Sequence, residues 1–217
     1  MKTENKVLMQ QARETLNGKW GVAVGGFAIY SVIVIAIDLV PVIGPLANLF
    51  IAGPLAGGLV IFSLALSRNQ EAKFEQLLEG FNDFFKYAVA YWRIVLLVLL
   101  WSLLLIVPGI IVAFSYALVF YILADDSSIS VKEAFEKSKA MMLGYKWKYF
   151  CLGLRFLGWA LLCIPTFGLG LLWLLPYMQV SLAKFYDDLK GEQTSSETAA
   201  IVASPQPAAT ENPASVV

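Results

Sequence analysis

Six long apolar runs constrain this chain more than any other feature of its sequence. They cover roughly residues 20–40, 46–66, 88–107, 109–124, 147–164 and 169–182. A helix needs about 20 apolar residues to cross a hydrocarbon layer of about 30 Å, because each residue adds about 1.5 Å. The fourth and sixth runs are short for this purpose. We predict an all-α membrane protein with about six transmembrane helices, paired as three hairpins.

The composition supports lipid contact. The chain is 59% hydrophobic and 15% charged, whereas soluble domains are about 45–50% apolar and about 25% charged. Its formal net charge is zero, so no overall basic field attracts nucleic acid. We expect the lipid bilayer to be the main partner of this protein and expect no nucleic-acid partner.

The links between the runs differ in charge. The links after the first, third and fifth runs are short, uncharged and built on Pro and Gly, whereas those after the second and fourth are long and charged. We assign all 16 Lys and Arg residues to the side of the membrane that carries the charged links and the two termini. The positive-inside rule then places both termini in the cytoplasm. We expect a cytoplasmic segment 1–19, a polytopic domain 20–190 and a location in the cell membrane.

Two charged segments carry apolar residues at helical spacing. Segments 74–85 and 131–143 each show the i, i+3, i+4, i+7 pattern of an amphipathic helix. Ser130 and Glu133 have the spacing of a capping box. We predict short cytoplasmic amphipathic helices in both places. Segment 191–217 is rich in Ser, Thr, Ala and Pro and is predicted to be a disordered cytoplasmic tail.

Three glycines suggest an internal repeat. Gly18, Gly80 and Gly144 each follow a segment with some helical amphipathicity and precede aromatic and lysine residues at the start of an apolar run. This pattern predicts a unit of cytoplasmic helix, glycine break and hairpin that occurs three times. The alternative, that any three hairpins look alike, stays open.

Aromatic and lysine residues mark the predicted membrane interface. Trp and Tyr favour the headgroup level, and lysine side chains reach back to it. The predicted cytoplasmic anchors are Trp20, Trp92, Trp147, Lys146 and Lys148, and the tryptophans toward the other ends are Trp101, Trp159 and Trp173. An aromatic belt is the favoured interpretation. A cage for a cationic ligand is the alternative.

Four polar residues fall within or near the runs. Arg155 lies inside the fifth run, where a charge either reaches the headgroups or serves a function. Gln179 follows a proline in the sixth run and is suited to interhelical hydrogen bonding or to a substrate path. Asn48 and Asp38 lie near the outer end of the first hairpin. These four positions are the candidates for a polar path.

The sequence offers little for catalysis. It contains no His, which removes His-based acid–base catalysis and the ordinary His-ligated metal sites. No known nucleotide, hydrolase or metalloprotease motif occurs. We therefore expect no enzyme, no cofactor, no metal and no catalytic residue.

Five stretches in order carry a resemblance to a known family. They are "GKWGVAVG", "GPLAGGLVIFSLALSRNQEAKFEQLLEGFNDF", "WSLLLIVPGIIVAFSYALVFYILADD", "SVKEAFEKSKAMMLGYKWKYFCLGLRFLGW" and "TFGLGLLWLLPYMQVSLAKFYDDL". Over roughly residues 8–190 the chain resembles the bacterial domain-of-unknown-function family 975. The resemblance implies a bacterial inner-membrane protein and supplies no ligand or catalytic residue. Arg155 is not a position counted as part of the family's pattern.

These observations favour a protein that acts through lipids, a membrane-protein partner or a second copy of itself. The motivating features are the large cytoplasmic share of polar residues and the short external links. The alternative is a small transporter or channel subunit with a polar path that involves Arg155 and Gln179.

Overall fold

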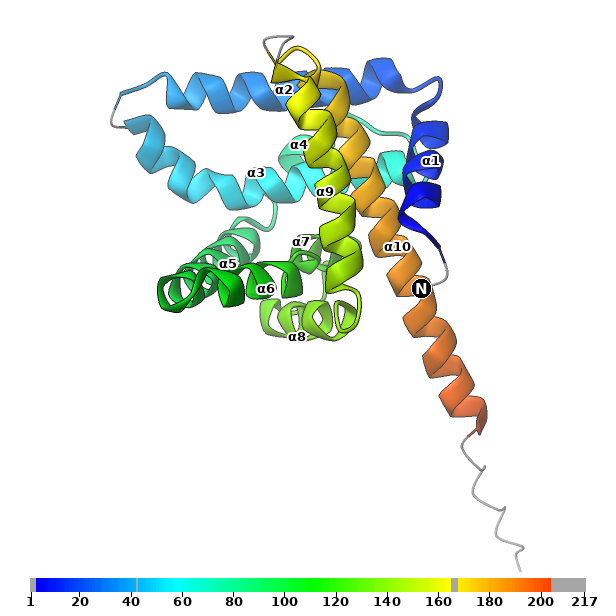
Figure 1. The fold of residues 1–217 in the computed structure, drawn as a ribbon. Coiled ribbons are helices and arrows are strands. Elements are labelled where there is room, and N and C mark those ends of the chain that lie inside the picture. The colour runs from blue at the N-terminus through cyan, green and yellow to red at the C-terminus, as the bar shows by residue number, and fades with distance from the viewer. Residues whose placement is uncertain (1–2, 42, 165–167, 204–217) are drawn as a thin grey trace, which may run out of the picture.

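The computed structural model describes residues 3–41, 43–164 and 168–203, which form helices and no strand (Figure 1). In chain order the helices are α1 (Asn5–Leu16), α2 (Trp20–Asp38), α3 (Ile43–Ser67), α4 (Gln76–Glu79), α5 (Phe84–Leu104), α6 (Ile106–Ser115), α7 (Val119–Asp125), α8 (Val131–Met141), α9 (Lys146–Leu162) and α10 (Leu171–Ala203). The all-α prediction is therefore confirmed for the described residues.

Among the described residues, four segments are long and apolar enough to cross a membrane. They are Trp20–Asp38, Leu46–Ser67, Phe84–Leu104 and Ile106–Asp125, and they coincide with the first four predicted spans. The fifth prediction falls on α9, which has 17 residues. The sixth falls on the start of α10, whose later turns are charged. The four segments support a membrane protein, while the fifth and sixth spans stay predictions.

Three helical hairpins extend in different directions from a common base, which we define as α1, α4, α7, α8 and the part of α10 that packs against them. Figure 1 shows α9 and α10 running across the direction of α2 and α3, while α5 and α6 form a separate pair. α1 lies along α10, where the Thr3 hydroxyl donates to Asp188 over 2.9 Å and Asn5 donates its side-chain amide to the Lys148 carbonyl, also over 2.9 Å. The hairpins thus diverge away from the base instead of forming one parallel bundle.

Helix α10 contributes to both apolar cores. One core joins α7, α8 and the middle of α10, where Leu123, Phe135 and Phe185 are buried together. The other joins α1, α2, α3 and α10, and includes Phe62 and Val180. Burial of apolar surface is the main stabilising contribution to folding, so α10 connects the two parts of the molecule.

Two of the three predicted glycine breaks have the expected backbone. Gly18 and Gly144 have φ angles of +80° and +84°, a left-handed conformation that glycine adopts without steric cost. Gly80 instead has a φ of −59°. The first and third units therefore share a helix, a left-handed glycine and a hairpin, and the middle unit departs from this pattern. The capping box of Ser130 and Glu133 is confirmed.

The prediction of one helix over 74–85 is wrong. Only α4 is helical before α5 begins at Phe84, and residues 80–83 form turns. The backbones of α3 and α4 approach so closely that a Cβ on Gly58 would lie 1.9 Å from the Leu77 carbonyl oxygen. A Cβ on Gly80 would lie 2.0 Å from the Pro54 carbonyl oxygen. This close contact holds the segment against α3 and turns the chain after one helical turn.

The predicted bounds 88–107 and 109–124 also need correction. The break lies at Leu105, which is extended, and α6 already begins at Ile106. Proline is tolerated in the first turn of a helix, because the N–H groups there have no intrahelical acceptor, so Pro108 does not mark the break. A second interruption separates α6 from α7 at 116–118. There the Ser138 hydroxyl donates to the Ser115 carbonyl over 2.9 Å.

The prediction of a disordered tail over 191–217 is wrong in its first part. Helix α10 continues to Ala203, because residues 191–203 contain no proline and their Glu, Gln and Ala residues favour helix. The Tyr145 hydroxyl donates to the Glu192 carboxylate over 2.8 Å and connects this extension to the start of α9. Residues 204–217 lie outside the described part of the chain.

Candidate functional site

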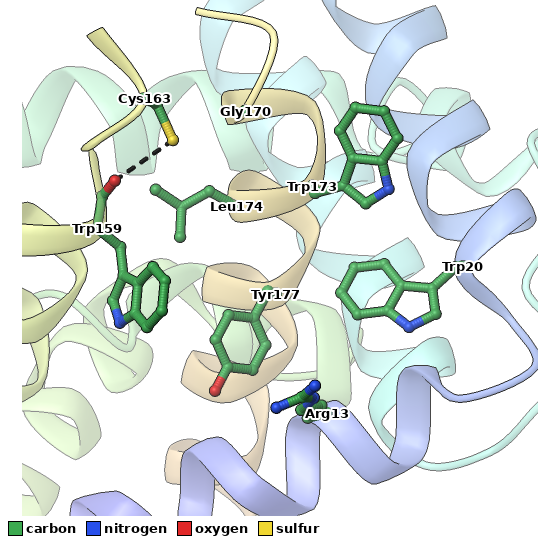
Figure 2. Close-up of a pocket in the computed structure, with 8 residues that line it drawn as sticks. All are labelled: Arg13, Trp20, Trp159, Cys163, Gly170, Trp173, Leu174 and Tyr177. Carbon is green, nitrogen blue, oxygen red and sulfur yellow. Dashed lines mark hydrogen bonds between the residues drawn. The ribbon is translucent and has the colours of Figure 1, made fainter. Parts of the chain in front are cut away.

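A pocket of about 330 Å³ lies between the first and third hairpins (Figure 2). Its walls come from α1, from the start of α2, from the end of α9 and from the first turns of α10. The lining residues are Arg13, Trp20, Trp159, Cys163, Gly170, Trp173, Leu174 and Tyr177. Three of the six tryptophans of the chain thus meet around one cavity. We refer to it as the aromatic pocket.

The helices place these side chains for simple geometric reasons. On α1, Ala12 and Leu16 are buried, so the neighbouring Arg13 points away from that buried stripe and remains exposed. The left-handed Gly18 then turns the chain, so that α2 starts with Trp20 beside the pocket. On α10, positions 173 and 177 share one face, because residues four apart are neighbours on a helix.

The pocket is aromatic on its walls and cationic at one end. Figure 2 shows Trp20 and Trp173 on one side and Trp159 on the other, with Tyr177 pointing toward Arg13. The side chains of Trp159 and Trp173 are 56% and 54% exposed, so much of their ring surface is left uncovered by protein. The Tyr177 ring packs edge-on against Phe156 with centroids 5.6 Å apart, which fixes its position.

Arg13 makes no hydrogen bond or ion pair within the described part of the chain. Its charge acts electrostatically on Tyr177, but no carboxylate lines the pocket. A guanidinium carries five N–H donors in a planar fork that suits carboxylate and phosphate oxygens. The arrangement can therefore bind an amphipathic molecule with an apolar part against the tryptophans and an anionic group on Arg13.

The predicted polar path is not assembled. Asn48 donates to Asp38 over 3.1 Å at the end of the first hairpin. The Tyr121 hydroxyl donates to the Gln179 side-chain oxygen over 3.0 Å near the base. Arg155 is exposed on α9, with no ion pair or hydrogen bond to the described residues. The four candidate residues thus lie in three separate places.

The predicted interface anchors lie in different environments. Trp20 lines the aromatic pocket, and Trp92 lines a second cavity of about 690 Å³ between α3 and α5. Trp147 is 73% exposed at the start of α9, and Lys146 is half-buried. Lys148 instead donates its ammonium to the Thr3 carbonyl and so contacts the segment before α1. Whether these residues meet headgroups stays a prediction.

Sequence reasoning missed a charged cluster at the base, made of Arg68, Asp125, Tyr186, Asp187 and Lys190. The Arg68 guanidinium lies 2.6 Å from Asp125 Oδ1 and 2.7 Å from Asp187 Oδ1. The Tyr186 hydroxyl donates to Asp125 over 2.9 Å, and the Lys190 ammonium pairs with the same carboxylate. The cluster joins the ends of α3 and α7 to α10. Its members lie in three segments that are far apart in the sequence, so no local motif predicts that they meet.

The cluster also perturbs its own titration. Burial alone would lower the pKa of Arg68, but hydrogen bonds to Asp187 and Asp125 outweigh this effect and raise the pKa above its usual value. Burial and the adjacent Asp125 raise the pKa of Tyr186 well above that of an exposed tyrosine. Both groups therefore keep their protons at neutral pH. The ion pairs and hydrogen bonds of the cluster hold α3, α7 and α10 together.

Comparison with known proteins identifies one family. Residues 94–193 match a family described as "Protein of unknown function (DUF975)". No curated protein and no solved structure matches the chain. The matched segment starts within α5 and ends within α10, so it includes the α10 side of the aromatic pocket and most of the charged cluster.

Proposed function

We propose that the protein, whose residues 94–193 match the DUF975 family, is a non-enzymatic multi-pass membrane protein that acts by binding lipids. A membrane-protein partner or a second copy of the chain is compatible with this proposal. The family description names no activity, so the support comes from the molecule itself.

The carrying observation is the apolar surface at the ends of the three hairpins, which we define as the described residues of 32–50, 96–111 and 154–173. Large hydrophobic side chains there point outward on every side of the helices: Leu39, Leu103 and Leu162 are 79%, 84% and 67% exposed. Burying one Leu removes apolar area worth about 1.5–3 kcal/mol. Contiguous patches of such side chains mark membrane or protein contact surfaces.

The topology is the finer part of the proposal. The first and second hairpins cross the membrane, and the base with both termini stays on the cytoplasmic side. The end of the third hairpin lines the aromatic pocket together with Arg13 and Trp20, so it stays at the cytoplasmic interface with them. An even number of crossings and the distribution of Lys and Arg support this orientation. The third hairpin, on which the fifth and sixth predicted spans fall, lies along the cytoplasmic leaflet, because its apolar end is exposed and α9 is short for a full crossing.

Transport has weaker support. A conduction path needs polar groups that face one cavity or each other. Gln179 on α10 is already hydrogen-bonded to Tyr121. Arg155 lies on a different helix, α9, and is exposed. The lining of the aromatic pocket holds no pair of titratable groups suited to acid–base chemistry, which favours binding over catalysis there.

Membrane extraction and cysteine labelling test the proposal. The expected result is that alkaline washing leaves the protein in the membrane fraction and that detergent releases it. In a variant with both native cysteines replaced, Leu46→Cys, Ile106→Cys and Leu169→Cys each report one hairpin end. A membrane-impermeant maleimide should label Leu46→Cys and Ile106→Cys in intact cells, and should label Leu169→Cys only after lysis.

Ser127→Cys, between α7 and α8, is the matched cytoplasmic position and should react only after lysis. Release by alkaline washing would overturn the proposal as a whole. Labelling of Leu169→Cys in intact cells would instead show that the third hairpin also crosses the membrane.

A further inference from the structure

We infer that the aromatic pocket is a binding site for an anionic phospholipid, with the phosphate on Arg13 and part of one acyl chain against the tryptophans. This inference rests on the proposed function, because it takes the ligand from the surrounding bilayer. It adds to that function a binding residue, Arg13, a binding site, the aromatic pocket, and a preference for negatively charged headgroups.

The position of the pocket points to a lipid. Its walls belong to α1 and to the first and third hairpins, where apolar side chains next to the lining residues are exposed, including Val22 and Leu162. A chain that leaves the pocket therefore continues along apolar surface. A volume of about 330 Å³ lies at the low end of small-molecule sites. It suits one segment of a lipid, while the rest remains in the membrane.

Arg13 differs from the other three arginines of the chain. Arg68 is neutralised by two carboxylates in the charged cluster. Arg93 stacks over the Phe135 ring, with its guanidinium carbon 4.5 Å from the centroid. Arg155 lies outside the pocket lining. Only Arg13 combines a place in the aromatic pocket with a charge that has no partner among the described side chains.

The charge of Arg13 selects the headgroup. Three tryptophans and a tyrosine around a cavity would by themselves suit a quaternary ammonium ion. A guanidinium in the same lining repels that cation, whereas it binds a phosphate through short charge-assisted hydrogen bonds. A headgroup with net negative charge, such as phosphatidylglycerol, therefore fits the pocket better than phosphatidylcholine, whose phosphate carries its own cation.

The test is lipid binding to the purified full-length protein, measured by native mass spectrometry after delipidation in detergent. The probes are dioleoyl phosphatidylglycerol, dioleoyl phosphatidylcholine and dioleoylglycerol. The expected order of affinity is phosphatidylglycerol first, with the other two weaker. Arg13→Gln should lower the phosphatidylglycerol affinity about tenfold, because it removes charge-assisted hydrogen bonds. Arg155→Gln removes the same charge from the third hairpin and should leave the affinity unchanged.

A second variant tests the apolar part. Trp173→Ala should weaken phosphatidylglycerol and dioleoylglycerol alike, because it removes ring surface rather than charge. Thermal unfolding in the same detergent identifies any variant that loses its fold. Inorganic phosphate in excess should not displace the lipid, which separates a lipid site from a free-phosphate site.

Three results would overturn the inference: equal losses in Arg13→Gln and Arg155→Gln, equal affinity for the three lipids, or displacement by inorganic phosphate. Each of these leaves the proposed function standing if the protein resists alkaline extraction. Release by alkaline washing would instead remove the proposed function and the inference together.

Discussion

The base of the molecule and the hairpin ends are both helical, but apolar side chains are buried at the base and exposed at the hairpin ends. At the base, Leu123 is 2% exposed and Asp125 has only 8% of its side chain exposed, although it is charged. At the hairpin ends, Leu103 is 84% exposed. The base depends on contacts within the chain, whereas the ends depend on what surrounds them. An apolar side chain therefore has a different meaning in each region.

The difference also explains why the two kinds of site differ. The charged cluster satisfies its groups internally and connects α3, α7 and α10. The aromatic pocket leaves both a cation and ring surface without protein partners. The first arrangement holds the fold together, and the second is available to a ligand. Substitutions that act on one region and spare the other test this division.

The largest effect is expected from Asp125→Ala. This change leaves Lys190 and the Tyr186 hydroxyl without their acceptor and removes one of the two carboxylates on Arg68. Breaking such a buried pair is strongly destabilising, here by about 3 kcal/mol. Thermal unfolding in detergent measures the loss. The exposed neighbour Asp126 is the matched control, and Asp126→Ala should lower the melting temperature far less.

A paired truncation compares the two regions with the same chemistry. Leu123→Ala opens a cavity in the core and should cost about 2–3 kcal/mol. Leu103→Ala removes the same atoms from an outward-facing position and should change the free energy of unfolding by less than about 0.5 kcal/mol. Equal losses in the same unfolding assay would mean that the end of the second hairpin is buried.

Two glycine-to-alanine substitutions test the close backbone contact between α3 and α4. Gly58→Ala places a Cβ 1.9 Å from the Leu77 carbonyl oxygen, and backbone cannot move aside cheaply. We expect a loss of about 1–3 kcal/mol, as for other overpacked sites. Gly153→Ala on α9 meets nothing within 4 Å and should be neutral or slightly stabilising, because alanine favours helix. A smaller loss for Gly58→Ala than for Gly153→Ala would contradict this assignment.

The smallest effect concerns the start of α8. Ser130→Ala removes the capping oxygen that accepts from the Glu133 backbone N–H over 3.3 Å and should cost about 1 kcal/mol. Hydrogen bonds from Ser130 lower the pKa of Glu133. The contacts from the Ser130 backbone N–H and side chain to this carboxylate are therefore complete above the ordinary pKa of a glutamate and are lost as the pH falls through the lowered one, whereas the bond from the Glu133 N–H to the Ser130 oxygen does not titrate. The gap in melting temperature between wild type and S130A should narrow on acidification.

Sequence reasoning predicted the features that are encoded locally. The apolar runs, the cap at Ser130 and the break at Gly144 each lie within a few residues, so spacing alone revealed them. The short α4 was missed, because its shape depends on contact between Gly80 and Pro54, which are distant in sequence. Propensity cannot reveal such a contact.

The candidate site was harder to predict for the same reason. Sequence spacing predicts Trp159 and Trp173 at the end of the membrane opposite Trp20, because it treats the spans as parallel. The crossing of the third hairpin over the first places all three around one pocket. Arg13 carried no signal of its own, since a single arginine on an amphipathic helix is ordinarily a solvated residue.

Helix α10 has a consequence for the order of synthesis. It supplies Phe185 to one core and Val180 to the other, and it carries two charged members of the base cluster. A ribosome delivers it last among the described helices. The first two hairpins therefore have unfinished cores until this helix emerges. Neither apolar core can be completed without α10, so both cores are completed only when this last helix packs against the rest of the chain.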